Sequence, residues 1–177
     1  LITDTLWSGV RNGAGTDAVD ICDGWGTIIA AEILGGDLTN VIATNAISAA
    51  NAVTEIEKVV NGTSAKMKSK GAIVYVSYTV FEYYRTHYRA SFTQIFNPNQ
   101  QGFYMIDGTK FRIQPCAFMG TSGRVVVTYA GNLKFGTDLD RLKMFPTPYL
   151  NILKNRILFP AGCQIQDLDV IYVNDQV

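Results

Sequence analysis

Histidine is almost missing from this 177-residue chain, which contains only His87. A metal site built from several histidines is therefore excluded, and any Ser-His-Asp or Cys-His catalysis would have to use His87. Cysteine is also scarce, because Cys22, Cys116 and Cys163 are widely spaced and form no C-x-x-C pair. This pattern argues against a disulfide framework and against a zinc knuckle, and it is typical of buried thiols in a reducing compartment.

Long hydrophobic runs are missing as well. The strongest apolar stretch, residues 72–81, is about half of the roughly 20 residues that a membrane-spanning helix needs. No secretory signal is recognisable, but the chain begins with Leu1 rather than Met, so we expect a fragment of a longer protein. Hydrophobic residues make up 47% and charged residues 17%, which is typical of a folded globular chain. At this length we predict one domain over residues 1–177.

The chain has no excess of positive or negative charge, since 15 basic residues balance 15 acidic ones. The two parts of the chain differ, however. Residues 1–60 contain eight acidic and two basic residues, whereas residues 61–177 contain thirteen basic and seven acidic ones, so the net charges are −6 and +6. This asymmetry predicts either surfaces that meet oppositely charged surfaces, including those of other copies, or two halves that fold against each other.

The N-terminal third contains one well-supported helix. Residues 1–26 are predicted to be irregular, because glycine-containing turn signals are crowded there. Residues 27–34 are a short apolar run that fits either a strand or a helix. A helix is predicted over residues 45–60, capped by Thr44 or Asn45, with Glu55 and Glu57 on its solvent side. Its apolar stripe consists of Ala49, Val53, Ile56 and Val60.

The rest of the chain alternates strands, turns and one further helix. A buried strand is predicted over residues 72–78, followed by a helix over 77–88 with Ser77 as its cap. Asp107-Gly108 predicts the tight turn of a hairpin between 103–106 and 109–113. Further strands are expected over 124–129 and 170–173, and Pro146 and Pro148 predict a loop. These elements predict an α+β fold with a mixed, mainly antiparallel sheet and flanking helices.

No motif in the sequence points clearly to catalysis. The glycine-rich stretches miss both G-x-G-x-x-G and G-K-[ST], so they are interpreted as turns. Two aspartate pairs, Asp138 with Asp140 and Asp167 with Asp169, could hold a cation or divide acid and base roles, but solvated loop acids are the favoured interpretation. We therefore assign no catalytic, cofactor-binding or metal-binding residue.

One surface could bind a ligand or a nucleic acid. Basic and aromatic residues interleave over residues 83–89, which include Tyr83, His87 and Arg89. Aromatic and basic side chains in this arrangement can stack on bases and contact phosphates, although the solvent-exposed end of an amphipathic helix has the same pattern. A small group of lysines adds to the positive charge upstream: Lys66, Lys68 and Lys70.

The succession of elements after residue 103 resembles a known family. The hairpin over 103–115, the strand and turn over 124–138 that contain Asn132-Leu133 and Gly136-Thr137-Asp138, and the closing strand to Val173 follow one another in the order found in the C-terminal part of tailed-bacteriophage major capsid proteins. Encapsulins share this shell fold. The upstream helix, strand and helix follow the same family order, and residues 24–25 and 44–46 resemble what precedes that helix in prophage-encoded members.

The resemblance implies a structural role. Family members are usually longer, so this chain would correspond chiefly to the axial domain at the centre of a capsomer, with a return strand of the peripheral domain. The family implies a shell subunit that acts by symmetric self-association, without enzyme activity or cofactor, located in the virion after assembly in the bacterial cytoplasm. Its partners would be other copies, with scaffold, portal and packaged DNA as further partners and no membrane. The alternative is a small ligand- or nucleic-acid-binding module that uses the surface at residues 66–89.

Overall fold

A six-stranded mixed sheet forms the centre of the computed structural model, which describes residues 2–15, 17–92, 98–99, 102–137, 143–149, 152–158 and 161–176. The strands of this sheet are β1 (Val41–Ile42), β2 (Ile73–Ser77), β3 (Tyr104–Met105), β4 (Arg112–Cys116), β5 (Val126–Thr128) and β10 (Ile171–Asn174). They are ordered β1-β10-β5-β2-β4-β3. The pairs β10–β5, β5–β2 and β4–β3 are antiparallel, while β1–β10 and β2–β4 are parallel. The predicted α+β fold with a mainly antiparallel mixed sheet is confirmed.

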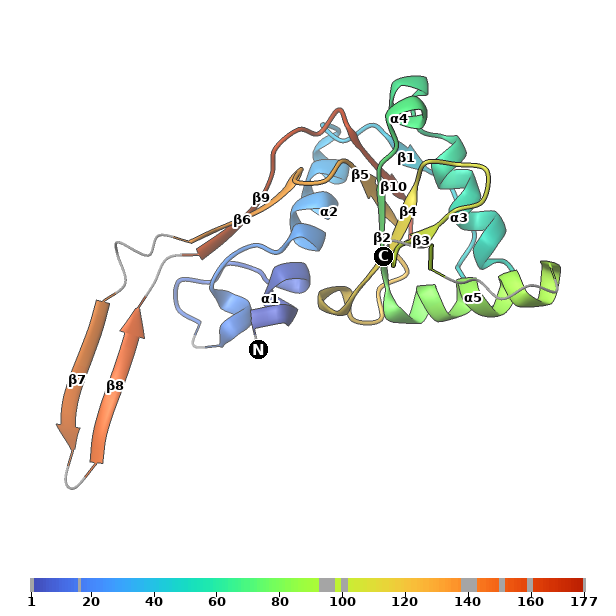
Figure 1. The fold of residues 1–177 in the computed structure, drawn as a ribbon. Helices are drawn as coiled ribbons and strands as arrows, with labels where there is room; N and C mark the ends of the chain where they lie inside the picture. Colours follow the sequence, from blue (N-terminus) through green and yellow to red (C-terminus); the bar gives the residue numbers. More distant parts are fainter. Residues whose placement is uncertain are drawn as a thin grey trace.

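Helices cover both faces of this sheet (Figure 1). The helices are α1 (Ile2–Ser8), α2 (Trp25–Gly35), α3 (Ala52–Asn61), α4 (Ala65–Lys70) and α5 (Tyr78–Phe92). Because alternate strand residues face opposite sides, Val125 and Val127 belong to the core beneath α3 and α5, whereas Val126 belongs to the core beneath α1 and α2. The register Val74↔Val127 makes β2 and β5 antiparallel neighbours at the centre of the sheet, and α3 packs against them.

The helix predicted over residues 45–60 begins later, at Ala52. Ser48 donates from its backbone N–H and its hydroxyl to Asn51 Oδ1, at 2.7 and 2.9 Å, and these local bonds compete with helical ones. Ala49 therefore precedes the helix and is exposed, so its place in the apolar stripe was wrong. Glu55 was also misplaced, because it is 2% exposed rather than on the solvent side.

The N-terminal segment is more regular than its glycines suggest. Residues 2–8 form α1, which is too short for its sequence to show a helical period, so the irregular assignment was wrong there. Trp7 is buried, and its ring lies 6.3 Å from that of Phe118 in the 3-10 turn Ala117–Met119. The apolar run at 27–34 is helical, as part of α2.

The predicted hairpin turn is present. Gly108 has φ +68°, and the Thr109 N–H donates to Ile106 O at 3.1 Å, so Asp107-Gly108 occupies the centre of a tight turn. The connection is wider than two residues, because the next backbone bond joins Ile106 N–H to Phe111 O. Tyr88 of α5 donates its hydroxyl to the Asp107 carboxylate, which ties the turn to the helix.

The loop predicted at Pro146 and Pro148 is instead a strand. Both prolines lie in β7 (Lys143–Tyr149), which pairs antiparallel with β8 (Ile152–Leu158). A two-stranded ribbon consists of edge strands alone, and an edge strand tolerates proline where its nitrogen faces away from the partner strand. Proline therefore did not exclude pairing here.

Candidate self-association surface

A long two-stranded ribbon leaves the body of the protein on the side of α1 and α2 (Figure 1). Its base is β6 (Leu133–Thr137) paired antiparallel with β9 (Ala161–Ile165), and its outer part is the β7–β8 pair. Lys134, Phe135, Gly136 and Thr137 of β6 are exposed. A two-stranded ribbon in water is only marginally stable and presents two unpaired strand edges, so it favours a further contact that covers it.

Trp25, the first residue of α2, holds both strands of the ribbon base. Its indole Nε1 donates to Lys134 O in β6 at 3.2 Å and to Gln164 O in β9 at 3.3 Å. Lys134 and Gln164 are register partners, so one donor reaches across the ribbon at a single level. The Trp25 ring is 7% exposed and lies 5.3 Å from the Phe118 ring, which anchors this donor in the core. Burial of the indole thus sets the direction in which the ribbon leaves the body.

Asn132 joins the two chain segments where they enter and leave the ribbon. Its amide donates to Thr128 Oγ1 at 2.8 Å and to Asp167 O at 2.9 Å, and its Oδ1 accepts from Asp167 N–H at 2.9 Å. The side chain is 5% exposed. Asn132-Leu133 is part of the motif that carries the family resemblance, but its place in the sequence does not predict these hydrogen bonds.

The outer ribbon is basic by sequence. Its two strands contain Lys143, Lys154 and Arg156 and no acidic residue. The register pairs Met144 with Ile157 and Pro148 with Leu153, so one set of alternate positions is free of charge. Positive charge and apolar residues therefore occur together in the ribbon.

The segment between α1 and α2 combines exposed apolar residues with acidic ones. Val10 and Val19 are joined by a backbone hydrogen bond of 2.9 Å and are 58% and 39% exposed, and Ile21 is 44% exposed. Asp17 and Asp23 are exposed nearby in the chain. An exposed apolar group rimmed by charge is typical of a contact surface.

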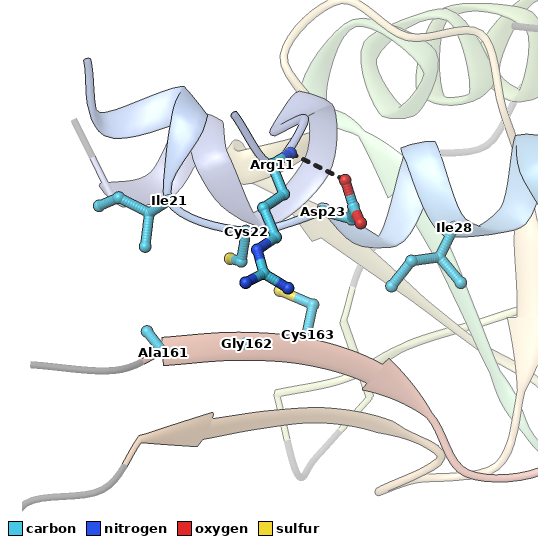
Figure 2. Close-up of a pocket in the computed structure, with 8 residues that line it drawn as sticks. All are labelled: Arg11, Ile21, Cys22, Asp23, Ile28, Ala161, Gly162 and Cys163. Atoms are coloured by element: carbon cyan, nitrogen blue, oxygen red, sulfur yellow. Dashed lines mark hydrogen bonds between the residues drawn. The ribbon is translucent and has the colours of Figure 1, made fainter. Parts of the chain in front are cut away.

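A surface pocket of about 520 Å³ separates this segment from strand β9 (Figure 2). Arg11, Cys22 and Asp23 line it from the N-terminal side, and Gly162 and Cys163 line it from β9. The Arg11 backbone N–H donates to Asp23 Oδ1 at 2.9 Å. Among the described residues, no group of three or more His, Cys, Asp and Glu side chains could hold a metal ion.

His87, the lone histidine, has a structural role. Its Nδ1 accepts the backbone N–H of Val53 at 3.0 Å, which satisfies one of the free amides at the start of α3. Tyr84 and Tyr88 are on the buried face of α5, and Tyr83 is 37% exposed. Two of the aromatic residues of the interleaved pattern at 83–89 therefore belong to the core, while Tyr83 and Arg89 remain exposed.

The three lysines of the predicted binding surface lie on α4, which precedes β2, whereas α5 follows it. The two groups are consequently placed at opposite ends of that strand (Figure 1). Lys68 Nζ donates to Asn61 O at 2.6 Å, and Lys70 Nζ lies 4.6 Å from the centre of the Tyr129 ring. The predicted binding surface is therefore divided rather than continuous.

The aspartate pairs do not form a site among the residues described. Asp167 and Asp169 are exposed, and Asp167 Oδ1 accepts the Asp169 backbone N–H at 2.9 Å, which is a local turn. Asp138 and Asp140 lie outside the described residues. Nowhere in the described part of the chain is a helix both long and apolar enough to span a membrane.

Comparison with known proteins supports a single type of fold. No protein-family model matches the chain, and no curated protein matches it either. Among solved structures, the chain is similar to one in the satellite phage P4 procapsid including size determination (Sid) protein, with a TM-score of 0.64 and 13% identity over 98% of this chain and 57% of that one. It is also similar to one in the capsid of the empty GTA particle computed with C5 symmetry, with a TM-score of 0.51 and 13% identity over 97% and 59%.

The chain thus spans a little under three fifths of each of these two structures. At 13% identity the likeness concerns the fold, and both neighbours come from capsid particles. The protein has a capsid-like α+β fold, from whose body the ribbon projects (Figure 1).

Proposed function

We propose that this chain is part of a structural shell subunit of a phage or prophage capsid and that it acts by symmetric self-association. The projecting ribbon on a capsid-like fold carries the proposal, because a two-stranded ribbon with two open edges needs a partner to cover it. The chain resembles tailed-phage major capsid proteins, which share their shell fold with encapsulins. Within such a protein it would correspond to the axial-domain portion.

Charge and exposed apolar area indicate which surfaces meet. The outer ribbon has Lys154 and Arg156 without an acidic residue, and the segment between α1 and α2 has Asp17, Asp23 and exposed Val10. Two different surfaces that complement each other give a head-to-tail contact, which closes into a ring when the rotation allows it. We propose that the ribbon of one copy contacts the acidic segment of the next.

The same proposal includes the absence of enzyme activity and of a cofactor. Residues considered for chemistry serve the fold instead: His87 accepts a helix amide and Asp167 forms a local turn. Following the family, scaffold, portal and packaged DNA are proposed partners, and the proposed location is the virion after assembly in the bacterial cytoplasm. The alternative binding module is less favoured, because its two halves, on α4 and on α5, lie at opposite ends of β2 (Figure 1).

Electron microscopy of the full-length protein that contains this sequence tests the proposal. We expect closed shells from the parent and none from a Lys154→Glu/Arg156→Glu variant, because reversed charges repel the acidic segment. Adding Asp17→Lys and Asp23→Lys should restore assembly. Lys66→Glu/Lys68→Glu carries the same charge change on α4, away from the ribbon, and is the matched control.

Two outcomes would contradict the proposal. A full-length protein that stays dispersed at every concentration would argue against a shell subunit. Salt-sensitive oligonucleotide binding that is lost when Lys66, Lys68 and Lys70 are replaced by alanine would favour the binding module instead. The melting temperature of each variant shows whether it is folded.

A further inference from the structure

Two cysteines that are 141 positions apart in sequence share one pocket. Cys22 lies in the turn before α2, and Cys163 lies in β9 at the base of the ribbon. Both cysteines line the same pocket, and Figure 2 shows both beside the Arg11 side chain. Cys163 Sγ also donates to Leu6 O of α1 at 4.0 Å. Two cysteines that line one pocket from separately anchored segments are placed so that a disulfide can join those segments.

The pocket gives a small reagent access to this pair. It is open to solvent and has a volume of about 520 Å³, which exceeds the size of a small thiol reagent's reactive group. Cys163 is half-buried, whereas Cys22 is 7% exposed. A reagent therefore meets Cys163 first, and the more buried Cys22 is the second thiol to react.

We propose that Cys22 and Cys163 form an intrachain disulfide when the protein meets a small-molecule disulfide such as oxidised glutathione. The Cys163 thiolate attacks one sulfur of the reagent, which forms a mixed disulfide and releases one small thiol. The Cys22 thiolate then attacks Cys163 Sγ, which forms the protein disulfide and releases the second small thiol. Two electrons pass from the protein to the reagent, and the two cysteine protons end on the released thiols.

This cross-link joins the segment before α2 to the ribbon base. Trp25, three residues after Cys22, already holds Lys134 and Gln164 of the same base through its indole. A covalent bond close to these Trp25 hydrogen bonds restricts the direction of the ribbon further. It also removes conformational freedom from the unfolded chain, because it closes the long loop between the two cysteines. The inference does not depend on the proposed function, since it concerns one chain alone.

Burial affects the rate of this exchange. Burial, with a smaller effect of the nearby Cys22, raises the pKa of Cys163 to about 11, so little thiolate exists at neutral pH. Below that pKa the attack on the reagent should accelerate roughly tenfold for each pH unit.

Purified protein treated with oxidised glutathione tests the inference. We expect the number of titratable thiols, measured after unfolding, to fall from three to one, and the mass of the intact chain to fall by about 2 Da. Proteolysis without reductant should yield one peptide pair that contains Cys22 and Cys163. The melting temperature should rise by about 5–10 °C and return to its original value after reduction.

Cys116 provides a matched control. It is buried in β4, and burial raises the pKa of this thiol to about 11 as well. Cys116→Ser should keep the cross-link and the rise in melting temperature, whereas Cys22→Ser and Cys163→Ser should each lose both. Three untouched thiols at pH 9, glutathione attached stably to the parent at Cys163, a bond to Cys116, or a covalent dimer would each overturn the inference.

Discussion

At the scale of single residues, Glu55 ties the segment before α3 to the helix itself. Its carboxylate accepts the Asn45 backbone N–H and the Asn45 amide, both at 3.0 Å, and Lys58 Nζ at 2.9 Å. Burial alone would raise the pKa of Glu55, but these hydrogen bonds outweigh it, and the pKa is lowered from its usual 4.5. The charged form is therefore the one that the folded state stabilises.

We predict that Glu55→Gln destabilises the protein at pH 7 by about 1–3 kcal/mol, because hydrogen bonds to a buried charged group are lost. A lowered folded-state pKa contributes stability above the unfolded value of 4.5 and loses it as the pH falls through the folded value. The difference in free energy of unfolding between the parent and Glu55→Gln, measured with urea, should therefore be smaller at pH 3 than at pH 7. Exposed Glu57→Gln is the control, and an equal difference at both pH values would contradict the explanation.

Substitutions at Gly108 test the effect of backbone strain without a steric clash. It has φ +68°, and a Cβ placed there would meet no atom within 4 Å, so a substitution adds strain without a clash. Gly108→Val should lower the free energy of unfolding by about 1–2 kcal/mol. Gly108→Asn should cost less, because asparagine tolerates the left-handed region. Equal unfolding midpoints for the two variants would show that the turn rearranges.

At the scale of elements, the ribbon depends on a contact that neither of its strands supplies. The Trp25 indole donates to one carbonyl of β6 and one of β9, and the same ring packs in the core near Phe118. The ribbon base is thus held by the start of a helix from the opposite end of the chain. Such an anchor is needed because a two-stranded ribbon has little core of its own.

Trp25→Phe should keep most of the packing and remove the shared donor. We expect faster amide exchange in β6 and β9 and unchanged exchange in β2 and β5, since the central sheet does not use this donor. Trp25→Leu, which also removes ring packing, should affect both regions. Unaltered exchange in the ribbon of the Phe variant would show that packing alone sets its direction.

At the scale of the whole molecule, charge should control association. The net charges of −6 over residues 1–60 and +6 over residues 61–177 favour head-to-tail contact between copies. Exposed charges are screened by salt, and contacts of modest area rarely survive dilution. The expected interaction is therefore weak and sensitive to ionic strength.

We predict that residues 1–177 sediment as a monomer, or as a weakly associating species, at micromolar concentration, and that association decreases as salt rises. Sedimentation velocity at low and high salt measures this. The Lys154→Glu/Arg156→Glu variant should lose the part of the association that depends on salt. A tight dimer that is indifferent to salt would count heavily against a shell subunit.

Local sequence by itself determined several elements of this fold. The β-branched run of β2, the helix capped by Ser77, whose Oγ accepts the Val80 N–H at 3.3 Å, and the Asp107-Gly108 turn each depend on neighbours in the chain. Alternation and turn chemistry act over a few residues, so a single sequence displays them. The same local signals were sufficient for the α+β class.

Tertiary structure alone decided the burial of Glu55, the helix at residues 2–8, the pairing of the proline-containing strand and the anchoring of the ribbon. Trp25 bonds to carbonyls 109 and 139 positions away, and Asn132 bonds to Asp167, 35 positions away. These contacts use backbone groups, which every residue carries, so residue types do not identify the partner of each side chain. Only the folded chain brings each donor to its partner, and for that reason the ribbon and the paired thiols at its base could not be predicted from residue types and spacing.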